Sequence, residues 1–588
     1  MSSADKPISD LRIASFASKS IFGLILTLFG PLLDRILGIN KLRKIYLSQN
    51  LTGLDKQAFA QKLLSALGVV IEGGSSVVEN LPQKGRCIVV CNHPYGMIEG
   101  VIIAHLLTSF RADTKIMANV GLQIFKEIQD YFIFANPLNP KAPINTTAIK
   151  QCFKHLNNDG LLVIFPAGRV SFYQADKQRI SDAQWNRLSV QLAIKTLSPI
   201  LPVFISGTNS PLFHRLGRIY YRFRLIMLAH EMFKLDKHII SLTANNLIDT
   251  KQFKEYKSVE KMNDFIRVQC YLNDHTYLSS WPEDKKINHY HDIIAAADTN
   301  DLKNELSALP DKQHLLDFKS FSVYYGYQNQ IPLCVQEIAR LREITFRTLD
   351  EGSGEALDTD KFDATYMHLF IFDHKNEEII GAYRIGQTDI LQKNGGLAQL
   401  YLSQMFTFQT DFINQQQPCL EMGRSFIITA HQNSFYGLLL LWKGIGAFVC
   451  QNPHYRTLYG TVSLSKRYDP RSVALINEVM ISDARGVVAK SPFKSQLHPE
   501  VLEFISLEKL AIKQLSTLIT GIESDGKDVP ILLKQYHKLG AVFHCIGIDT
   551  NFNQTPGLLL SIDLPKAPDK LLRLYLGKGK DDYLRYAL

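Results

Sequence analysis

The sequence predicts two domains in succession: an α/β domain with a mostly parallel sheet, followed by an α+β domain. At 588 residues, the chain is too long for one ordinary hydrophobic core. Its first half alternates short apolar segments with helical ones, whereas its second half is rich in strands flanked by helices. The contents of hydrophobic residues (46%) and charged residues (21%) are ordinary for a globular fold.

The first half contains three short apolar segments that each end in a turn: CIVVCNHP, LLVIFPAG and SPILPVFISG. Helical periodicity over residues 51–80 precedes the first segment, and the helical pattern MIEGVIIAHLLTSF follows it. In a mostly parallel sheet, ligands gather in the loops beyond the strand ends. Here those loops contain His93, Arg169 and Gly207.

The second half begins after a polar stretch at about residues 282–317, which we interpret as a linker with one amphipathic helix. From about Phe321 the order is a helix (VQEIARLREITF), two strands around a HKNE turn, and the later strands CLEMGRSFII and GLLLSIDL. The predicted division is a membrane-interface segment at 1–50, the α/β domain at 51–250, a helical and polar linker at 251–318, the α+β domain at 319–568 and a basic tail at 569–588.

The N-terminal segment at residues 21–33 (IFGLILTLFGPLL) is apolar apart from Thr27. It is too short to span a membrane, which needs about 20 residues in a helix. No small-residue cleavage site of a signal peptide follows it. The cations of LDRILGINKLRK come next, a pattern typical of a helix that lies in the membrane interface. A buried core helix is the alternative.

The net charge of +9 favours an anionic partner, namely a lipid surface, an acidic protein or nucleic acid. Nucleic acid is the weakest of these because the chain lacks a dense Lys/Arg block, zinc-finger spacing and an RNA-binding aromatic signature. The eight cysteines form no CxxC pair. Cys87 and Cys91 flank an apolar run, so we interpret them as buried thiols of a strand rather than metal ligands, in a reducing compartment.

A histidine and a glutamate stand six residues apart in the segment NHPYGMIEG (92–100). A histidine takes a proton from an alcohol well only if a carboxylate orients its ring and stabilises its cation. Glu99, one turn into the following helix, could fold back onto His93. Gly96 would let the loop turn tightly, and backbone N–H groups at the helix start could hold an oxyanion. Without further context, a histidine and a glutamate six residues apart are more often surface residues.

This segment resembles the NHxxxxD motif of glycerolipid acyltransferases of the lysophosphatidic-acid acyltransferase type, and more closely the NHPxGxxD/E variant of their haemolysin-like branch. FPAGRVS (165–171) stands in place of the family's FPEGTRS, and PILPVFISG (199–207) in place of its PVxI block. The resemblance covers roughly residues 20–240. It implies that His93 is the base and Glu99 its orienter. It also implies a set of substrate-binding residues: Asn92, Gly96, Phe165, Pro166, Gly168, Arg169 and Ser171.

The departures from this family concern the groups that bind glycerol phosphate. Ala167 replaces the family's glutamate, and Val170 replaces its arginine. The preceding block, where relatives often carry arginine, reads YFIFANP. Because phosphate recognition favours planar, multidentate cations, we expect an acceptor without phosphate.

The second half carries ionisable residues on or beside apolar strands, where they are costly unless paired or functional. Singly, each of them is more often part of an ion pair. Their order, which includes one aromatic residue, is Arg342, Phe346, Asp360, Asp363, Arg384, Glu421 and Arg424.

This order resembles the acyl-homoserine-lactone synthase branch of the GNAT-like fold: LRxxxF, DxxD, a strand ending in Arg, then ELSRF. It is more similar to the amino-acid N-acyltransferases that make lyso-ornithine lipid, over about residues 320–565. The tryptophan of the lactone synthases is missing, and Glu351 stands nearby, which argues against homoserine-lactone chemistry.

The resemblance implies a thioester donor and an amine acceptor. A carboxylate such as Glu421 would take a proton from the α-amine. Arg384 and Arg424 would hold carboxylate or thioester oxygens, while Asp360 and Asp363 would fix the N-terminal segment or a cationic side chain. GNAT-like folds splay two strands around the pantetheine arm. Acyl carrier protein is the expected donor, with acyl-CoA as the alternative, because no glycine-rich pyrophosphate loop follows the last arginine. No metal or other cofactor is expected.

The order of the two halves resembles that of the bifunctional ornithine lipid synthases. This implies that the C-terminal half attaches a 3-hydroxyacyl group to ornithine and that the N-terminal half esterifies the hydroxyl of the resulting lyso-lipid. The expected location is the cytoplasmic face of a bacterial inner membrane, bound peripherally. Two alternatives remain. One is a 1-acylglycerol-3-phosphate acyltransferase fused to an acyltransferase for another amine, such as glycine or lysine. The other is a haemolysin-like lipid-binding protein without catalysis.

Overall fold

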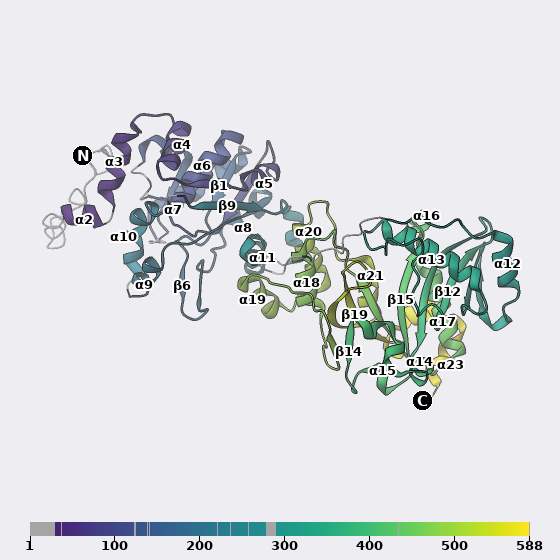
Figure 1. Ribbon diagram of the computed structural model, residues 1–588. Coiled ribbons are helices and arrows are strands. Elements are labelled where there is room, and N and C mark those ends of the chain that lie inside the picture. The colour runs from purple at the N-terminus through teal and green to yellow at the C-terminus, as the bar shows by residue number, and fades with distance from the viewer. Residues whose placement is uncertain are drawn as a thin grey trace. The chain divides into compact units, whose positions relative to one another are not determined.

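The structure is a computed structural model that describes residues 30–36, 38–120, 122, 125–137, 139, 141–219, 221–235, 237–256, 258–277, 281, 290–432 and 434–586. The chain divides into two compact units (Figure 1). The first unit extends to Tyr277 and also includes Leu497–Glu508 and Thr520–Gly526. The second unit consists of Leu278–Gln496, Lys509–Ile519 and Lys527–Leu588.

A seven-stranded, mostly parallel sheet forms the centre of the first unit, in the order β1-β9-β8-β2-β5-β3-β4. Only the pairing of β8 with β9 is antiparallel among these strands. The central strand β2 is fully buried, as expected for an apolar run with parallel neighbours on both sides. The strands are β1 (Val70–Glu72), β2 (Cys87–Cys91), β3 (Lys115–Asn119), β4 (Phe132–Ala135), β5 (Leu161–Ile164), β8 (Ile200–Ile205) and β9 (Ile239–Ala244).

Helices flank this sheet, and a small hairpin extends from it. The hairpin pairs β6 (Phe172–Gln174) with β7 (Arg179–Ser181). The helices are α2 (Gly30–Ile36), α3 (Ile39–Ser48), α4 (Lys56–Ala66), α5 (Gly74–Glu79), α6 (Ile98–Phe110), α7 (Pro143–Asn157), α8 (Leu188–Thr196), α9 (Pro211–Ile219), α10 (Tyr221–Met232), α11 (Val259–Tyr271) and α19 (Pro499–Glu508). The α/β fold with a mostly parallel sheet is thus as predicted from the alternating pattern.

The second unit is built on an eight-stranded sheet in the order β10-β11-β12-β13-β15-β16-β19-β18. Its only parallel pair among the described strands is β15 with β16. The strands are β10 (His314–Phe318), β11 (Phe321–Gly326), β12 (Met367–Asp373), β13 (Glu378–Gln387), β15 (Cys419–Ile427), β16 (Thr457–Ser463), β18 (Val542–Asp549) and β19 (Thr555–Asp563), beside a small sheet of β14 (Phe406–Phe408) and β17 (Val487–Ala489).

Helices cover this second sheet, with α13 and α17 the longest of those described (Figure 1). Helix α17 packs on strands β10 to β13. The helices are α12 (Thr299–Ser307), α13 (Pro332–Arg347), α14 (Thr388–Lys393), α15 (Ile413–Gln416), α16 (Thr429–Gln432), α17 (Phe435–Gln451), α18 (Pro470–Met480), α21 (Ile531–Lys538), α22 (Asp569–Leu576) and α23 (Lys580–Arg585), with α20 (Ile512–Ile522) belonging to this unit up to Ile519. Mixed strands and helices in this order agree with the predicted α+β class.

Strands β15 and β16 separate partway along their length. Their pairing runs from Cys419 opposite Thr457 to Met422 opposite Gly460 and then ends, although both strands continue. Just past this point a β-bulge in β15 places Arg424 and Ser425 opposite the single residue Tyr383 of β13. The divergence opens a space between two neighbouring strands, as expected for a GNAT-like sheet.

Three of the predicted boundaries are wrong because apolar positions within polar stretches pack into a core. The expected linker at 251–318 includes α11, whose buried face (Phe265, Ile266) belongs to the first unit. The expected basic tail at 569–588 forms α22 and α23, which pack on α17 and bury Leu572 and Tyr583. The expected α+β domain at 319–568 contains two segments, 497–508 and 520–526, that belong to the first unit.

The predicted membrane-interface segment lies mostly outside the described residues. Of the apolar run at 21–33, the structure describes only the part from Gly30 onward, in α2. The following α3 buries Leu42 and Tyr46 in the core of the first unit, so the boundary predicted at residue 50 is too late. Within the described ranges, every helix is too short or too polar to cross a bilayer. Cys87 and Cys91 are buried free thiols of β2, as predicted.

Candidate active sites

The first candidate site lies in the loop that leaves the central strand β2. His93 follows the buried strand by two residues, and Glu99 lies in the first turn of α6. Gly96 between them has φ +91°, a left-handed conformation that glycine adopts without strain. The loop therefore turns back sharply, and His93 Nδ1 lies 3.2 Å from Glu99 Oε1.

Backbone hydrogen bonds hold the Glu99 carboxylate beside the imidazole. Its Oε1 atom accepts from the N–H groups of Tyr95 (2.5 Å) and Gly96 (2.9 Å), and the residue is fully buried. Burial opposes the charge on His93, but the charge and proximity of Glu99 more than offset it and raise the pKa of His93 above its ordinary value. In turn, His93 and the N–H group of Gly96 lower the pKa of Glu99 despite its burial. The imidazole and the carboxylate are thus placed as a candidate base and the acid that would orient it.

A second buried carboxylate, Asp182, supports the same loop and has no motif that marks it in the sequence. Its Oδ1 atom accepts hydrogen bonds from the backbone N–H of His93 (3.2 Å) and from Ser171 Oγ (2.5 Å). Its Oδ2 atom accepts from Trp185 Nε1 (2.9 Å). Burial raises the pKa of Asp182, although these donors and Arg267 oppose the rise.

A cavity of about 370 Å³ opens beside His93. Its lining is mainly apolar, which suits an acyl chain. Of the residues predicted to bind substrate, Gly96, Phe165, Gly168 and Arg169 line it, and the Phe165 ring lies 4.6 Å from the imidazole ring between centroids. The other lining residues include Met97, Ile116, Met117, Leu122, Ile164, Val170, Leu188 and Leu228.

Three of the predicted substrate-binding residues instead stabilise the loop and do not line the cavity. The amide of Asn92 exchanges two hydrogen bonds with the backbone of Ile205 in β8. The carbonyl of Pro166 accepts from Asn186, and Ser171 is buried against Asp182. Their side chains or backbone groups already make hydrogen bonds within the fold, and their role in binding substrate stays a prediction.

A cation stands at this cavity despite the loss of the family's phosphate-binding groups. Arg169 is exposed, lines the cavity and lies 5.9 Å from the Phe172 ring. Arg224 of α10 lies over the same ring at 4.3 Å, and burial together with the charge of Arg169 lowers its pKa. The pattern FPAGRVS suggested the first of these two cations, whereas no sequence signal marked the second.

The second candidate site is a cavity of about 200 Å³ in the second unit, where β15 and β16 diverge. Of the residues predicted for this half, Phe346, Arg384, Glu421 and Arg424 line it. Several aromatic residues that the sequence did not single out join them. The polar and aromatic lining includes Glu351, Tyr366, Tyr383, Tyr401, Trp442, Tyr459, Ser463, Tyr536, Asp549 and Phe552.

Glu421 is buried at this cavity and held by three donors. Its Oε1 atom accepts from Tyr366 OH (2.8 Å) and from the backbone N–H of Leu402 (3.3 Å), and its Oε2 atom accepts from Tyr459 OH (2.9 Å). Burial raises the pKa of Glu421, and the two phenols only partly offset the rise. A carboxyl with a raised pKa in a cavity is a candidate proton acceptor.

Arg424 occupies the bulge of β15 in a left-handed conformation (φ 49°), which is strained for a residue other than glycine. Its guanidinium lies over the rings of Tyr401 (5.0 Å) and Phe552 (4.5 Å), and one N–H group donates to Tyr401 OH (3.2 Å). Burial opposes its charge, but nearby carboxylates, Asp358 first, raise the pKa of Arg424 further. The bulge thus aims a permanent cation at the cavity.

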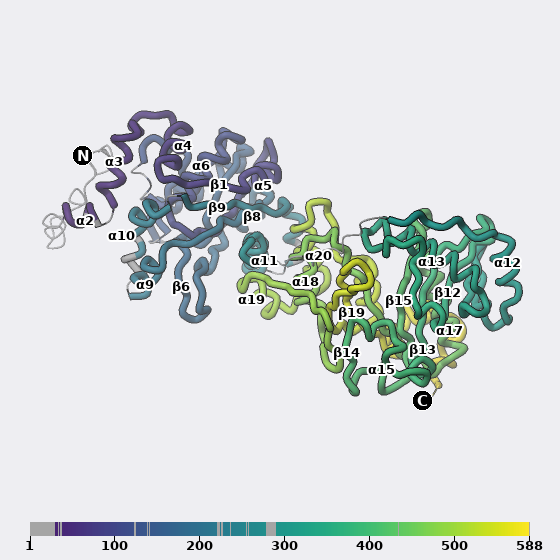
Figure 2. The backbone as a smooth tube through the Cα atoms, viewed as in Figure 1, coloured from purple at the N-terminus to yellow at the C-terminus, as the bar shows by residue number. Residues whose placement is uncertain are grey.

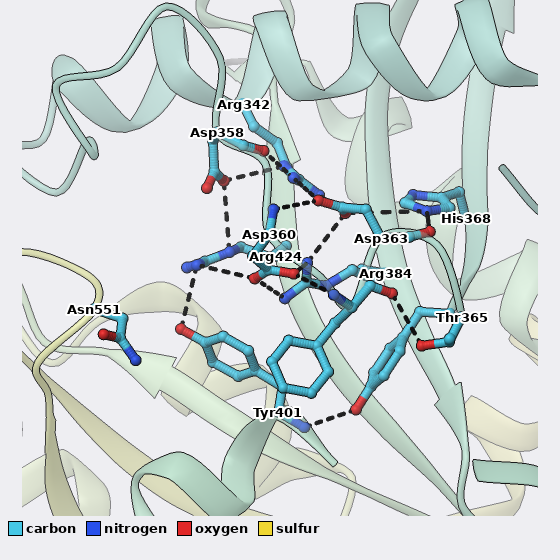
Figure 3. A network of polar contacts seen from close by, with 12 residues as sticks. Arg342, Asp358, Asp360, Asp363, Thr365, His368, Arg384, Tyr401, Arg424 and Asn551 are labelled. Atoms are coloured by element: carbon cyan, nitrogen blue, oxygen red, sulfur yellow. Dashed lines mark hydrogen bonds and ion pairs between the residues drawn. The ribbon is translucent and has the colours of Figure 1, made fainter. Parts of the chain in front are cut away.

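Arg424 and the other charged residues form a buried ion-pair network, in which Arg424 lies 3.5 Å from Asp358 and 3.8 Å from Asp360 (Figure 3). Arg342 pairs with Asp358 (3.0 Å) and Asp363 (3.0 Å), and Arg384 pairs with Asp360 (2.6 Å) and Asp363 (3.0 Å). Arg342, Asp360 and Asp363 do not line the cavity. Their described side-chain contacts are ion pairs within the fold, and their substrate-binding role stays a prediction. Arg384 reaches the cavity with its N–H groups already engaged by carboxylates.

Glu351 lines the same cavity. In the sequence it stands near the position of the missing tryptophan, and no role was predicted for it. It is 3% exposed, and its Oε2 atom accepts a hydrogen bond from Ser463 Oγ (3.1 Å). Burial raises the pKa of Glu351 to about 7, with Ser463 and Arg424 opposing the rise. It can therefore change charge near neutral pH.

Comparisons with known proteins support two acyl-transfer domains. The family described as "Acyltransferase" matches residues 34–277, and the family described as "Acetyltransferase (GNAT) domain" matches residues 341–443. These ranges contain His93 with Glu99 and Glu421 with Arg424, respectively. The chain is an acyltransferase, with an acyltransferase domain in its first half and a GNAT domain in its second.

Characterised relatives act in the synthesis of aminolipids. A glycine N(alpha)-acyltransferase of Bacteroides thetaiotaomicron is 28% identical over 292 residues, which is 46% of this chain and 86% of the relative. A lyso-glycine lipid O-acyltransferase of Phocaeicola vulgatus is 26% identical over 231 residues, which is 38% of this chain and 79% of the relative. The chain is thus similar both to an N-acyltransferase and to an O-acyltransferase.

Among solved structures, a CoA-dependent acyl-homoserine lactone synthase determined with SAM and isopentyl-CoA is 11% identical, with a TM-score of 0.23. The match covers 43% of this chain and 89% of that one. At such values the likeness bears on neither mechanism nor substrate.

Proposed function

We propose that the chain is a bifunctional synthase of a two-chain aminolipid. The second unit would acylate the α-amine of an amino acid with a 3-hydroxyacyl group. The first unit would then esterify the hydroxyl of that one-chain lipid with a second acyl group. One observation carries the proposal: each unit has its own cavity with a candidate proton acceptor, the half-buried His93 beside the buried Glu99 in one and the buried Glu421 in the other.

In the first unit, the neutral imidazole of His93 would accept the proton of the acceptor hydroxyl as the oxygen attacks the acyl thioester. Glu99 would stabilise the imidazolium that forms. The apolar cavity would hold an acyl chain. Arg169 at the cavity would pair with the carboxylate of the lyso-lipid's head group, which explains why a cation remains where the phosphate-binding residues are lost.

In the second unit, Glu421 would take the proton that the α-ammonium must lose before it attacks the thioester. Arg424 would hold the carboxylate of the amino acid or the thioester oxygen, because its position in the bulge points a buried guanidinium at the cavity. The divergence of β15 and β16 would admit the pantetheine arm of the donor. We propose acyl carrier protein as that donor, since an acidic carrier complements a chain of net charge +9.

The proposed amino acid is ornithine, which the order of the two halves favours. A side-chain ammonium needs a buried carboxylate as partner, and Glu351 lines the cavity with one described hydrogen bond, from a neutral hydroxyl. Glycine is the second candidate because the relatives named above act on glycine or on lyso-glycine lipid. Both reactions would take place at a membrane surface, since intermediate and product are amphiphiles.

Lipid analysis of a heterologous bacterium tests the proposal. Expression of the chain should produce a one-chain and a two-chain aminolipid, and mass spectrometry identifies the head group directly. Purified protein given ornithine or glycine, with 3-hydroxyacyl carrier protein or 3-hydroxyacyl-CoA, then ranks acceptors and donors. Production of diacylglycerol phosphate instead of aminolipid would overturn the proposal in favour of a phosphate acceptor.

A further inference from the structure

A helix from the second half of the sequence belongs to the unit that contains His93. Helix α19 (Pro499–Glu508) lies beside α11 in the first unit, some 400 residues after the loop that it supports (Figure 2). Its inner face buries Glu500, Val501, Phe504 and Ile505. Burial of a glutamate on this face requires a positive partner.

Glu500 has three cationic partners, all from the first half of the chain. Its Oε2 atom lies 3.0 Å from an N–H group of Arg267, which is itself buried on α11. Its Oε1 atom accepts from Arg179 on the β6–β7 hairpin (2.8 Å). Lys177 of the same hairpin lies 3.5 Å away. These cations lower the pKa of Glu500 although its burial opposes the change, so the residue remains charged.

Arg267, which pairs with Glu500, also holds the backbone around Asp182 through hydrogen bonds. Its two terminal nitrogens donate to the carbonyl oxygens of Ala183 (2.9 Å) and Asp182 (3.0 Å). The carboxylate of Asp182 in turn holds the N–H of His93 and the hydroxyl of Ser171. The N–H of Ser171 donates back to the His93 carbonyl oxygen (2.8 Å). A continuous series of contacts therefore leads from Glu500 through Arg267 and Asp182 to the backbone N–H and carbonyl groups of His93.

We infer that Glu500 is a positioning residue for the His93 site, so that a segment of the second half of the sequence completes the O-acyltransferase site of the first. The inference rests on the proposed function of that site. If the carboxylate is removed, the buried Arg267 loses its ion pair and keeps Asp182 and Asp264 as its acidic neighbours. We expect its guanidinium to shift toward them and to disturb its hydrogen bonds to the backbone of Asp182 and Ala183. The loop that carries His93 then loses its fixed position.

The test uses the full chain with Glu500→Gln, which keeps the shape of the side chain and removes its charge. We expect the kcat of lyso-lipid O-acylation to fall at least about tenfold, because small displacements of a catalytic group are costly. The KM for the lyso-lipid should change little, since Glu500 lies outside the cavity. N-acylation of the amino acid by the same molecules should be unchanged and serves as an internal measure of intact protein.

Two further variants separate positioning from general stability. Glu500→Asp restores the charge and should recover part of the lost rate. Glu508→Gln, on the same helix, removes a carboxylate that pairs with the partly exposed Lys261 (2.6 Å) and should leave O-acylation at the wild-type rate. The NMR signal of His93 in protein with labelled histidine, identified by its loss in His93→Gln, should shift or broaden in Glu500→Gln and not in Glu508→Gln.

The inference is overturned if Glu500→Gln retains wild-type O-acylation and an unshifted His93 signal while the wild-type chain is active. It is also overturned if Glu500→Asp remains as slow as Glu500→Gln while N-acylation and circular dichroism show folded protein. Absence of O-acylation in the wild-type chain is a different result, because that outcome contradicts the proposed function itself. Loss of both activities and of the folded signal in Glu500→Gln would assign a purely structural role.

Discussion

His93 Nδ1 lies 3.2 Å from Glu99 Oε1, and the same carboxylate oxygen accepts hydrogen bonds from the N–H groups of Tyr95 and Gly96. The carboxylate is therefore fixed before any substrate binds. A fixed carboxylate on one ring nitrogen leaves the other nitrogen of His93 to act toward the cavity. This relationship makes the function of the first unit testable separately from that of the second.

Replacement of His93 by alanine should remove O-acylation and leave N-acylation intact. General base catalysis contributes about 10² to 10⁴ in rate, and no described carboxylate of the cavity lining can replace it. Cells that express His93→Ala should therefore accumulate the one-chain lipid. Lipid mass spectrometry measures the ratio of the two products. Continued formation of the two-chain lipid would contradict the assignment of this site.

Replacement of Glu99 by glutamine should change the pH profile of O-acylation as well as its rate. Glu99 raises the pKa of His93 above the ordinary value of about 6.5. Because the active base is the neutral imidazole, the O-acylation rate of the wild type should fall as the pH drops through this raised pKa. Without the carboxylate, the imidazolium loses its partner and the acidic limb should move to lower pH. Rates of lyso-lipid esterification from pH 5 to 9 measure this. An unmoved limb would mean that another group controls the profile.

Replacement of Glu421 by alanine should abolish both lipids in cells, because the one-chain lipid is the substrate of the other site. O-acylation of added lyso-lipid by the purified variant should remain at the wild-type rate. Tyr436→Phe serves as a control, since Tyr436 belongs to the same unit but does not line the cavity. If Glu421→Ala still forms the one-chain lipid at a wild-type rate, a different residue accepts the proton.

Sequence reasoning recovered the strands that carry both sites because apolar runs that end in glycine or proline are strong local signals. It also anticipated that His93 lies beside Glu99 and that Glu421 and Arg424 lie close together, because these residues are near one another in the sequence and in or next to a strand. Their catalytic roles stay predictions. It could not distinguish cavity residues from their supports. Ser171 and Asp363 sit in recognisable motifs, yet each is used within the fold.

The residues that sequence reasoning missed are those whose partners are distant in the chain. Asp182 reaches His93 across 89 residues, and Glu500 reaches Arg179 across 321 residues. Neither has a local pattern that differs from an ordinary surface acid. The wrong domain boundaries have the same cause. The residues that α11 and α19 bury contact segments far away in the sequence, so the local sequence does not assign either helix to the first unit.

Replacement of Arg342 by alanine should reduce stability rather than affect substrate affinity. Arg342 is 1% exposed, and its loss would take one cationic partner each from the buried Asp358 and Asp363. Arg424 and Arg384 would remain beside them, so we expect a cost of up to about 3–5 kcal/mol, the range for breaking a buried pair. Chemical denaturation measures the free energy of unfolding. Lys303→Ala, which breaks an exposed pair with Glu377, should change that free energy little. A raised KM for the amino acid with unchanged stability would restore the predicted binding role.

The same network predicts loss of stability in acid. Burial opposes the charge on Asp363, but Arg342 and Arg384 more than offset it and hold its pKa well below its ordinary value. A carboxylate with a lowered pKa in the folded state stabilises the protein above its unfolded pKa of about 4, and this stabilisation is lost as pH falls below that point. The midpoint of thermal unfolding should therefore drop more steeply below pH 4 in the wild type than in Asp363→Asn.

Replacement of Glu351 by glutamine should distinguish ornithine from glycine as the acceptor. Burial raises the pKa of Glu351 to about 7, so its carboxylate forms as pH rises through neutrality. If it pairs with a side-chain ammonium, the ratio of kcat/KM for ornithine to that for glycine should rise between pH 6 and 8. Both acceptors share an α-amine, so its deprotonation largely cancels in this ratio.

In Glu351→Gln the ratio should be flat and lower by about tenfold or more, the equivalent of 1.4 kcal/mol for one lost charge pair. Glu355→Gln, in the same loop but exposed, should keep the wild-type ratio. A ratio in Glu351→Gln equal to that of the wild type at every pH would contradict the pairing and favour an acceptor without a side-chain cation.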